Sequence, residues 1–318
     1  MRFRQLGRSG PTVSVVGLGC TNFGKRTDLE QTRAVVHAAL DAGVTLFDTA
    51  DIYGGQGASE ELLGRVLGGR WDGVVLATKF GADMGGAVAP ESVPRGSRRY
   101  VKAAVEGSLR RLRAEQIDLY QLHEPDPRTP IEETLAALDD LVRAGTVRHV
   151  GSSNLAAWQI VDADWTARTT GTSAFVSAQN EYSLLHREVE ADVVPACEHL
   201  GLGLLPYFPL AAGLLTGKYA RDRAPAGRLA EPKYASWLTD AALDRVEALR
   251  RYAEDRGRAL LDVAIGGLAA QPAVTSVIAG ATRPEQVRAN VAAGEWQPTP
   301  ADLAALDEVA PGPGSTRR

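Results

Sequence analysis

Short apolar runs recur along this chain, and most end about 30 residues after the run before, which is the length of one strand and one helix. Eight such runs end near residues 19, 48, 79, 123, 152, 179, 206 and 280. Several are continuously apolar, as strands covered on both faces are. We therefore predict a single (β/α)8 barrel domain over residues 1–318, with strands at Val15–Gly19, Val44–Asp48, Gly73–Lys79, Ile117–His123, Val147–Ser152, Ala174–Gln179, Leu202–Pro206 and Val274–Gly280.

Helical patterns separate these runs. Thr27-Asp28-Leu29-Glu30 and Thr129-Pro130-Ile131-Glu132 resemble capping boxes at helix starts. Apolar residues at helical spacing follow both of them. The predicted helices cover Ala34–Leu40, Ala103–Leu112, Leu135–Val142, Ala156–Ala167, Val189–Leu200 and Leu261–Ala270.

The remaining segments predict a hairpin, two long loops and a tail. Two short strands around Ser9-Gly10 indicate an N-terminal β-hairpin. The connections Gly81–Tyr100 and Leu210–Leu238 follow the third and seventh strands, so both are expected at the same end of the barrel. Loops of this length are usually functional or disordered. Residues 312–318 are expected to be a disordered tail.

Composition limits the classes of protein that fit. The 318 residues are 44% hydrophobic and 23% charged, with a net charge of −4 and a pI of about 5.8. These values are ordinary for a globular protein and argue against broad binding to nucleic acids or anionic membranes. Cys20 and Cys197 lie far apart, and the N-terminus has no apolar signal region, so a cytoplasmic location is expected. Leu200–Gly217 lacks charge but contains two prolines, and we interpret it as a buried strand entering a loop.

Polar side chains close three neighbouring strand-like runs. Asp48 closes the second run, Lys79 closes the third, and His123 closes the fourth after IDLYQL. Tyr53 lies five residues beyond Asp48, in a Gly-rich loop. In a parallel barrel the active site lies where the C-terminal ends of the strands meet. We therefore expect these four side chains to converge on one rim.

These residue types suit the protonation of a carbonyl oxygen. A tyrosine has a solution pKa near 10 and acts as an acid only when its phenolate is stabilised. Lys79 could supply that stabilisation, and Asp48 could keep the ammonium charged and oriented. His123 could hydrogen-bond the carbonyl and orient it. The set suits carbonyl reduction, provided that a hydride donor is present.

Each residue also has a plainer interpretation when taken alone. Asp48 can cap a turn, Tyr53 can cover the barrel mouth, and His123 can be a hydrogen-bonded core residue. Lys79 fits such an explanation less well, because a lysine that closes an apolar strand is seldom buried without a partner. The four residues together favour an active site.

The order of several longer motifs resembles the aldo-keto reductases. The motifs extend from about Arg2 to Asn290 and read FDTADIYGGQGASEELLG, VVLATKF, IDLYQLHEPDP, VRHVGSSNL and VIAGATRPEQVRANV. The resemblance implies a (β/α)8 barrel that reduces aldehydes and ketones with NADPH. It also implies that Asp48, Tyr53, Lys79 and His123 form the catalytic tetrad, and that Tyr53 protonates the carbonyl oxygen while hydride reaches the carbon.

No familiar nucleotide-binding loop is present. The pattern GxGxxG fails at Asn22, and GLLTGK at residues 213–218 is one residue short of a P-loop, so a dinucleotide would bind at the barrel rim. Thr282-Arg283-Pro284-Glu285 resembles a capping box that opens a helix. Free N–H groups at that helix start, together with Arg283, would suit the 2′-phosphate of NADP. A plain capped surface helix is the alternative.

The resemblance implies the other cofactor contacts. Ser153, Asn154 and Gln179 would hydrogen-bond the nicotinamide carboxamide, unless Ser153 or Asn154 caps the following helix. Tyr207 would stack on the nicotinamide, barrel-top packing being the alternative. NADPH is expected before NADH. Many relatives carry a glutamate where this chain has Ala289, which loosens the expected adenine contacts and makes this cofactor preference weaker than the expectation of carbonyl reduction. The other implied cofactor residues are Thr21, Asn22, Asp48, Leu210, Gly213, Gly280, Thr282, Arg283, Gln286 and Asn290.

Phe23, Phe80 and Trp237 are expected to shape the substrate pocket with Tyr53 and His123, ordinary loop packing being the alternative. The expected partner is a small carbonyl compound, without nucleic acid, membrane or metal, because the acidic residues after His123 have no matching His or Cys ligands nearby. Two other functions remain open. One is a non-catalytic NADPH-binding regulatory module, and the other is a sugar or polyol dehydrogenase that works mainly in oxidation.

Overall fold

A parallel sheet curled into a barrel forms the centre of the molecule. The computed structural model describes residues 1–69, 71–219 and 227–313. Its eight parallel strands follow the order β10-β3-β4-β5-β6-β7-β8-β9. A bridge between Leu204 and Val274, and a hydrogen bond of 3.0 Å from the Ile278 amide to the Pro206 carbonyl, join the two ends of the sheet. The predicted (β/α)8 fold is confirmed, with strands β3 Val16–Gly19, β4 Leu46–Asp48, β5 Val75–Phe80, β6 Ile117–Leu122, β7 Val147–Ser153, β8 Ser177–Gln179, β9 Gly203–Leu204 and β10 Val277–Gly280.

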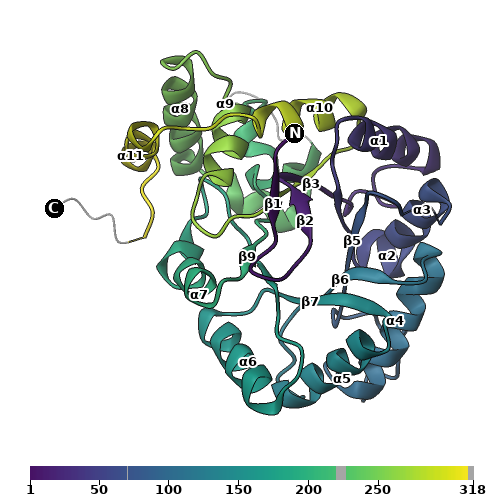
Figure 1. Cartoon of the computed structure of the whole chain (residues 1–318). Coiled ribbons are helices and arrows are strands. Elements are labelled where there is room, and N and C mark those ends of the chain that lie inside the picture. Colours follow the sequence, from purple (N-terminus) through teal and green to yellow (C-terminus); the bar gives the residue numbers. More distant parts are fainter. Residues whose placement is uncertain (70, 220–226, 314–318) are drawn as a thin grey trace.

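Helices surround the barrel, and Figure 1 shows most of them as a ring around the strands. The strands are buried along almost their whole length, as their continuous apolar patterns predict. The helices are α1 Leu29–Asp41, α2 Tyr53–Gln56, α3 Ala58–Leu67, α4 Arg98–Leu112, α5 Ile131–Arg143, α6 Ala157–Thr170, α7 Val193–Leu200, α8 Asp240–Glu254, α9 Leu260–Asp262, α10 Pro284–Ala293 and α11 Pro300–Val309.

The predicted capping boxes are wrong in detail. Helix α1 begins one residue later than expected, with Asp28 as its N-cap and Gln31 as the partner that completes the box. Thr27 instead hydrogen-bonds the Thr32 hydroxyl at 2.9 Å. At α5 the N-cap is Pro130, which has no side-chain cap, because Thr129 donates its hydroxyl to Asp126. An aspartate thus replaces the threonine as the cap of α1, and α5 has no side-chain cap.

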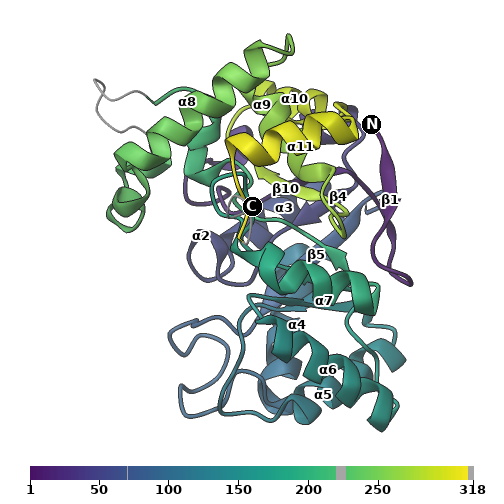
Figure 2. The same cartoon turned by 90° about the vertical axis from the view of Figure 1, so that its left-hand side faces the viewer.

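The predicted N-terminal hairpin closes one end of the barrel. Strands β1 Phe3–Gln5 and β2 Thr12–Ser14 pair antiparallel. Leu6 and Val13 are fully buried against the inward-facing side chains of the barrel strands. Gly7 has φ 63°, and a Cβ there would lie 2.5 Å from the Val176 carbonyl oxygen, so only glycine allows this close approach. Figure 2 shows the hairpin at the right-hand end of the barrel and both long loops at the left.

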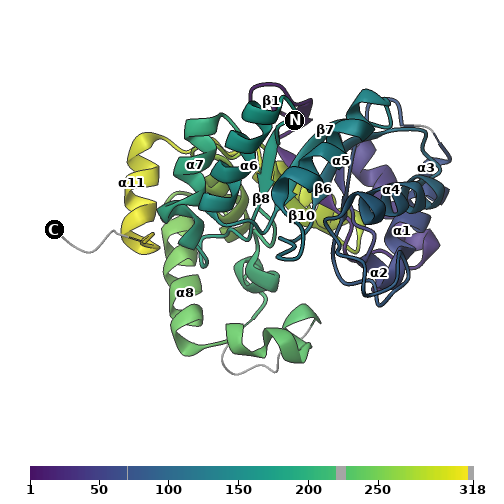
Figure 3. The same cartoon turned by 90° about the horizontal axis from the view of Figure 1, so that it is seen from below.

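The two long connections lie at the same end of the barrel, as predicted, and the hairpin lies at the opposite end (Figure 2). One joins β5 to α4. The other joins β9 to α8 and contains the 3₁₀ segments Ala211–Thr216, Gly227–Ala230 and Pro232–Trp237. In Figure 3 the green part that leads into α8 lies below the ends of the strands. Residues 220–226 of this connection, and residues 314–318 of the predicted tail, lie outside the described residues. Among the described helices, none has the length and apolar character needed to cross a membrane.

Candidate active site

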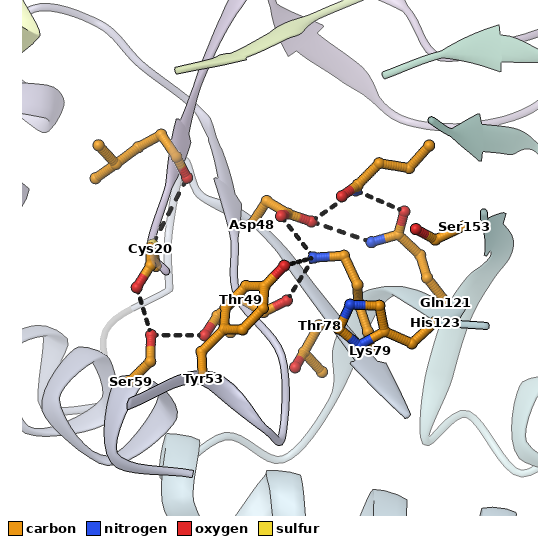
Figure 4. Close-up of polar contacts among 12 residues, drawn as sticks. Cys20, Asp48, Thr49, Tyr53, Ser59, Thr78, Lys79, Gln121, His123 and Ser153 are labelled. Atoms are coloured by element: carbon orange, nitrogen blue, oxygen red, sulfur yellow. Dashed lines mark hydrogen bonds and ion pairs between the residues drawn. The ribbon is translucent and has the colours of Figure 1, made fainter. Parts of the chain in front are cut away.

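The four residues expected to form the active site meet at the C-terminal end of the barrel. Asp48 is the last residue of β4, Lys79 is the penultimate residue of β5, and His123 directly follows β6. Tyr53 is the first residue of the single-turn helix α2. Because β4, β5 and β6 are parallel neighbours, their ends bring these side chains together, as Figure 4 shows.

A buried ion pair lies at the centre of this group. Lys79 is fully buried, and its Nζ donates to Asp48 Oδ2 at 2.6 Å and to the Thr49 carbonyl at 2.9 Å. Burial alone would lower the pKa of Lys79, but Asp48 and Tyr53 outweigh burial and raise that pKa above its usual value. The lysine is therefore charged at neutral pH. A third hydrogen bond, of 3.3 Å, runs from Nζ to Tyr53 Oη.

Tyr53 is a phenol that keeps its proton. Burial raises its pKa, Lys79 opposes this shift, and Asp48 adds to it. The balance differs from the expectation that Lys79 would dominate, because the buried ion pair presents a carboxylate as well as an ammonium. A protonated phenol beside an ammonium is poised to donate when an acceptor oxygen gains negative charge, since the phenolate that results lies next to Lys79.

His123 is a neutral imidazole at this rim. Its ring contacts the Tyr53 ring edge-to-face, with centroids 5.7 Å apart. Burial, aided by the nearby charge of Lys79, lowers the pKa of His123 to about 3. The ring can therefore donate a hydrogen bond without carrying a charge. Its Nδ1 has no partner among the described residues.

Two glutamines hold Asp48; sequence reasoning missed Gln121 and assigned Gln179 only to cofactor binding. Gln121 Nε2 donates to Asp48 Oδ1 at 3.1 Å, and Gln179 Nε2 donates to the same oxygen at 2.9 Å. Both glutamines are buried, and Gln179 also donates to Gln121 Oε1 at 3.1 Å. Together with Lys79, which donates to Oδ2, they give both carboxylate oxygens of Asp48 a hydrogen-bond partner. A glutamine inside the apolar run IDLYQL was the available signal for Gln121.

A cavity of about 730 Å³ opens at this end of the barrel. Its wall includes Tyr53 and His123. Lys79 lies behind that wall, fully buried. Every expected cofactor residue except Arg283 lines the cavity, namely Thr21, Asn22, Asp48, Ser153, Asn154, Gln179, Tyr207, Leu210, Gly213, Gly280, Thr282, Gln286 and Asn290.

The residues expected to bind a nicotinamide carboxamide already contact one another. Asn154 Nδ2 donates to the His123 carbonyl at 3.0 Å and to Ser153 Oγ at 3.2 Å. Tyr207 Oη donates to Asn154 Oδ1 at 2.8 Å. The N-cap of α6 is Ala156, so the alternative that Ser153 or Asn154 caps this helix is wrong.

Several expected site residues lie elsewhere. Phe23 and Phe80 are fully buried in the core, where Phe80 stacks on Tyr120 with centroids 4.8 Å apart, so the expectation that they shape the substrate pocket is not met. Lys79 faces the barrel interior, and side chains alternate along a strand, so Phe80 points outward to the helices. Trp237 lies outside the wall of the main cavity.

The start of α10 differs from the predicted capping box. Arg283 is the N-cap, its side chain makes no cap hydrogen bond, and it is exposed beside the cavity instead of on its wall. The Thr282 amide and hydroxyl both donate to Gln286 Oε1, at 2.8 and 3.1 Å. Thr282, the expected N-cap, therefore gives both of its hydrogen bonds to Gln286 instead of capping the helix.

Basic side chains that the sequence reasoning did not single out line the same cavity. They are Arg26, Lys218, Arg228 and Lys233. Arg228 Nη2 donates to Asn22 Oδ1 at 2.8 Å, which links the β9–α8 connection to the loop after β3. Glu231 adds a second link through ion pairs with Lys25 and Arg26. The connection thus borders the cavity on the side where the positive charges gather.

A second buried polar cluster lies behind the rim. Asp51 is fully buried, and neither carboxylate oxygen has a partner among the described residues. Glu60 lies nearby and accepts hydrogen bonds from Thr78 Oγ1 at 2.5 Å and from Arg111 Nε at 2.7 Å. Burial, with the negative charge of Glu60, raises the pKa of Asp51 to about 8. Asp51 therefore holds a proton at neutral pH.

The substitution Asp51→Asn is expected to flatten part of the pH dependence of stability. The native state binds one more proton than the unfolded state between the unfolded pKa of 3.8 and the native pKa of about 8, so wild-type stability falls as pH rises through this window. When the pH rises from 6 to 8, the free energy of unfolding of wild type should fall by about 2 kcal/mol more than that of Asp51→Asn. Urea unfolding at several pH values measures this difference, and parallel curves would contradict a protonated Asp51.

No group of three or more His, Cys, Asp or Glu side chains suited to hold a metal ion occurs among the described residues. Of the acidic residues that follow His123, Asp126 accepts hydrogen bonds from the Gly96 amide at 2.7 Å and from Thr129 Oγ1 at 2.7 Å.

Comparison with known proteins places the chain in a family. Residues 15–311 match the family model described as Aldo/keto reductase family. The uncharacterized oxidoreductase YrpG of Bacillus subtilis (strain 168) is 37% identical over 99% of this chain and 97% of its own. A probable voltage-gated potassium channel subunit beta of Oryza sativa subsp. japonica is 36% identical over 92% and 91%. The L-glyceraldehyde 3-phosphate reductase of Escherichia coli (strain K12) is 33% identical over 92% and 87%. The chain therefore belongs to the aldo/keto reductase family of oxidoreductases.

Proposed function

We propose that this protein reduces an aldehyde or ketone to the alcohol, with NADPH as hydride donor and Tyr53 as proton donor. The observation that carries the proposal is the buried contact of Lys79 Nζ with both Asp48, at 2.6 Å, and Tyr53 Oη, at 3.3 Å, at the edge of a large cavity. Burying an ion pair carries a large desolvation cost, so an ion pair buried beside a phenol at a cavity favours a functional role.

The cavity suits a phosphorylated dinucleotide. Its volume of about 730 Å³ lies in the usual range for small-molecule and cofactor sites. Arg26, Lys218, Arg228 and Lys233 supply positive charge for phosphate groups. The N-terminus of α10 adds the positive end of a helix dipole beside Thr282 and Gln286. Bound NADPH would supply the hydride that reaches the carbonyl carbon.

The residues of the rim would supply the other parts of the reaction. The neutral His123 ring would donate a hydrogen bond to the carbonyl oxygen and orient it. Tyr53 Oη would transfer its proton to that oxygen as negative charge develops there. Lys79 would then stabilise the phenolate, while Asp48, held by Gln121 and Gln179, keeps Lys79 charged and in position. These groups need no rearrangement during the step, which is the basis of electrostatic preorganisation.

The same assay separates two further candidates. The rice relative is named a probable channel subunit, which favours testing for a module that binds NADPH without turnover. A dehydrogenase that works mainly in oxidation would use the same residues in reverse. All four tetrad residues and their contacts favour catalysis over a regulatory role alone.

The direct experiment combines cofactor binding with turnover. NADPH and NADH are titrated by fluorescence, and loss of NADPH absorbance is followed with a panel of aromatic, aliphatic and sugar aldehydes and ketones. We expect tighter binding of NADPH than of NADH and reduction of at least one class of carbonyl. Binding without any turnover in either direction would favour the regulatory module. Faster oxidation of alcohols at equal saturation would favour the dehydrogenase.

A further inference from the structure

A second hollow of about 360 Å³ lies next to the main cavity. The residues that line only this hollow are Asn180, Glu181, His186, Glu188, Val189 and Trp237, and we call it the acidic groove. It shares Asn154 and Tyr207 with the wall of the main cavity. A ligand in the main cavity could therefore extend a substituent into this groove past those two side chains.

The groove gathers negative charge. Glu181 lies 3.9 Å from His186 Nδ1, and its side chain is partly buried. Burial raises the pKa of Glu181, His186 opposes this shift, and Glu188 adds to it. Glu188 thus disfavours the charge of Glu181, and a bound cation would offset this repulsion. None of the described residues that line the groove is a lysine or an arginine.

An unused acceptor and an aromatic ring complete the groove. Asn180 is only 8% exposed, and its Nδ2 donates to the Leu155 carbonyl at 3.2 Å. Its Oδ1 has no partner among the described residues. The Trp237 ring lies 4.6 Å from the His186 ring and contacts Tyr234 edge-to-face, which fixes its position. Carboxylates, an amide oxygen and an indole together favour a ligand that is positively charged and rich in hydrogen-bond donors or apolar methyl groups.

The two hollows therefore differ in charge. Arg26, Lys218, Arg228 and Lys233 line only the main cavity, where the phosphates of a dinucleotide would be held. A phosphate or carboxylate on the far end of a substrate would meet Glu181 and Glu188 in the groove. Like charges at such short range are repelled, so the groove selects against anionic substrates.

We propose that the acidic groove binds an ammonium group on the carbonyl substrate, so that the enzyme prefers aldehydes or ketones that carry a cationic amine away from the carbonyl. This inference rests on the proposed function for the substrate role, but cation binding in the groove stands independently of turnover. The amine stays unchanged in the reaction, and its only role is to position the carbonyl.

Cation binding is tested first, without catalysis. Benzyltrimethylammonium is titrated calorimetrically into the full-length protein, with and without NADPH. The Glu181→Gln/Glu188→Gln variant is expected to bind it about tenfold more weakly than wild type. Glu247→Gln, which removes an exposed carboxylate on α8, is the matched control and should bind as wild type does. Equal binding by all three proteins would overturn the cation site.

Substrate preference is tested with three matched benzaldehydes. They carry, in the para position, a trimethylammoniomethyl group, its neutral neopentyl isostere or a sulfomethyl group. We expect kcat/KM to fall by about tenfold at each step from cation to neutral to anion. The double glutamine variant should lose the preference for the cation over the neutral compound, and Glu247→Gln should keep it.

The outcomes separate the two proposals. Turnover of the neutral aldehyde without any charge preference would overturn the groove assignment and leave carbonyl reduction intact. Glutamate-dependent binding of benzyltrimethylammonium without turnover of any carbonyl would overturn carbonyl reduction and leave the cation site intact. A polyhydroxylated aldehyde that outperforms the cation, with equal effect in the glutamine variant, would identify a sugar subsite and contradict the ammonium proposal.

Discussion

Tyr53→Phe is expected to lower kcat for carbonyl reduction by about three orders of magnitude, which is the usual contribution of a positioned general acid. The change removes one oxygen, whose contact in the rim is the 3.3 Å hydrogen bond from Lys79 Nζ. Lys79 keeps its bonds to Asp48 and to the Thr49 carbonyl, so the buried charge stays compensated. NADPH affinity should change by less than about twofold, because the phenol acts on the carbonyl and not on the dinucleotide.

The matched control is Tyr252→Phe on α8. This variant also loses a phenol hydroxyl with a hydrogen bond, in this case of 2.7 Å to the Asp302 carbonyl, but it lies away from the cavity. Stopped-flow measurement of a single turnover, together with NADPH titration, separates chemistry from binding. A Tyr53→Phe enzyme with at least one tenth of wild-type kcat would assign the proton to another donor, and Tyr252→Phe should retain full kcat.

The arrangement of the tetrad could be predicted because it depends on chain order alone. Asp48, Lys79 and His123 follow three successive parallel strands, and such strands end on the same side of a barrel. Tyr53 follows within five residues of Asp48, so the loop cannot carry it far away. Local spacing was enough for all four positions.

Other parts of the site depend on contacts that no local pattern encodes. Arg228 and Lys218 reach the cavity because the β9–α8 connection folds back toward the loop after β3, and that connection has little regular periodicity. Phe80 was misplaced because β5 extends one residue beyond Lys79, which turns its ring toward the helices. The acidic groove combines residues after β8 with Trp237, more than forty positions further along the chain.

The glutamines around Asp48 show how the fold stabilises a charge that the sequence only suggests. Gln121 and Gln179 come from β6 and β8, and both donate to a single carboxylate oxygen of Asp48. The other oxygen faces Lys79. Asp48 is only 2% exposed, so these donors replace the water that would otherwise stabilise the ion. The ion pair is therefore part of a buried network, and loss of one member affects the others.

Lys79→Met is expected to destabilise the fold by about 3–5 kcal/mol as well as abolish turnover, because it leaves the buried carboxylate of Asp48 without its counter-ion. Asp48→Asn should also be destabilising, since Lys79 then remains charged without a carboxylate partner. The double variant Asp48→Asn/Lys79→Met removes both charges. It should be less destabilised than the sum of the two single variants by about 2 kcal/mol or more.

Urea unfolding of the four proteins completes this cycle, and NADPH titration shows whether each variant still has a formed cavity. All three variants should be inactive. Lys79→Met and the double variant lack the ammonium that stabilises the Tyr53 phenolate, and in Asp48→Asn the ammonium is no longer held in place beside Tyr53. If each single variant lost less than about 1 kcal/mol, the pair would behave as a solvated surface ion pair. Additive losses would mean that Asp48 and Lys79 do not interact energetically. The ion pair could then not be what keeps Tyr53 ready to donate its proton.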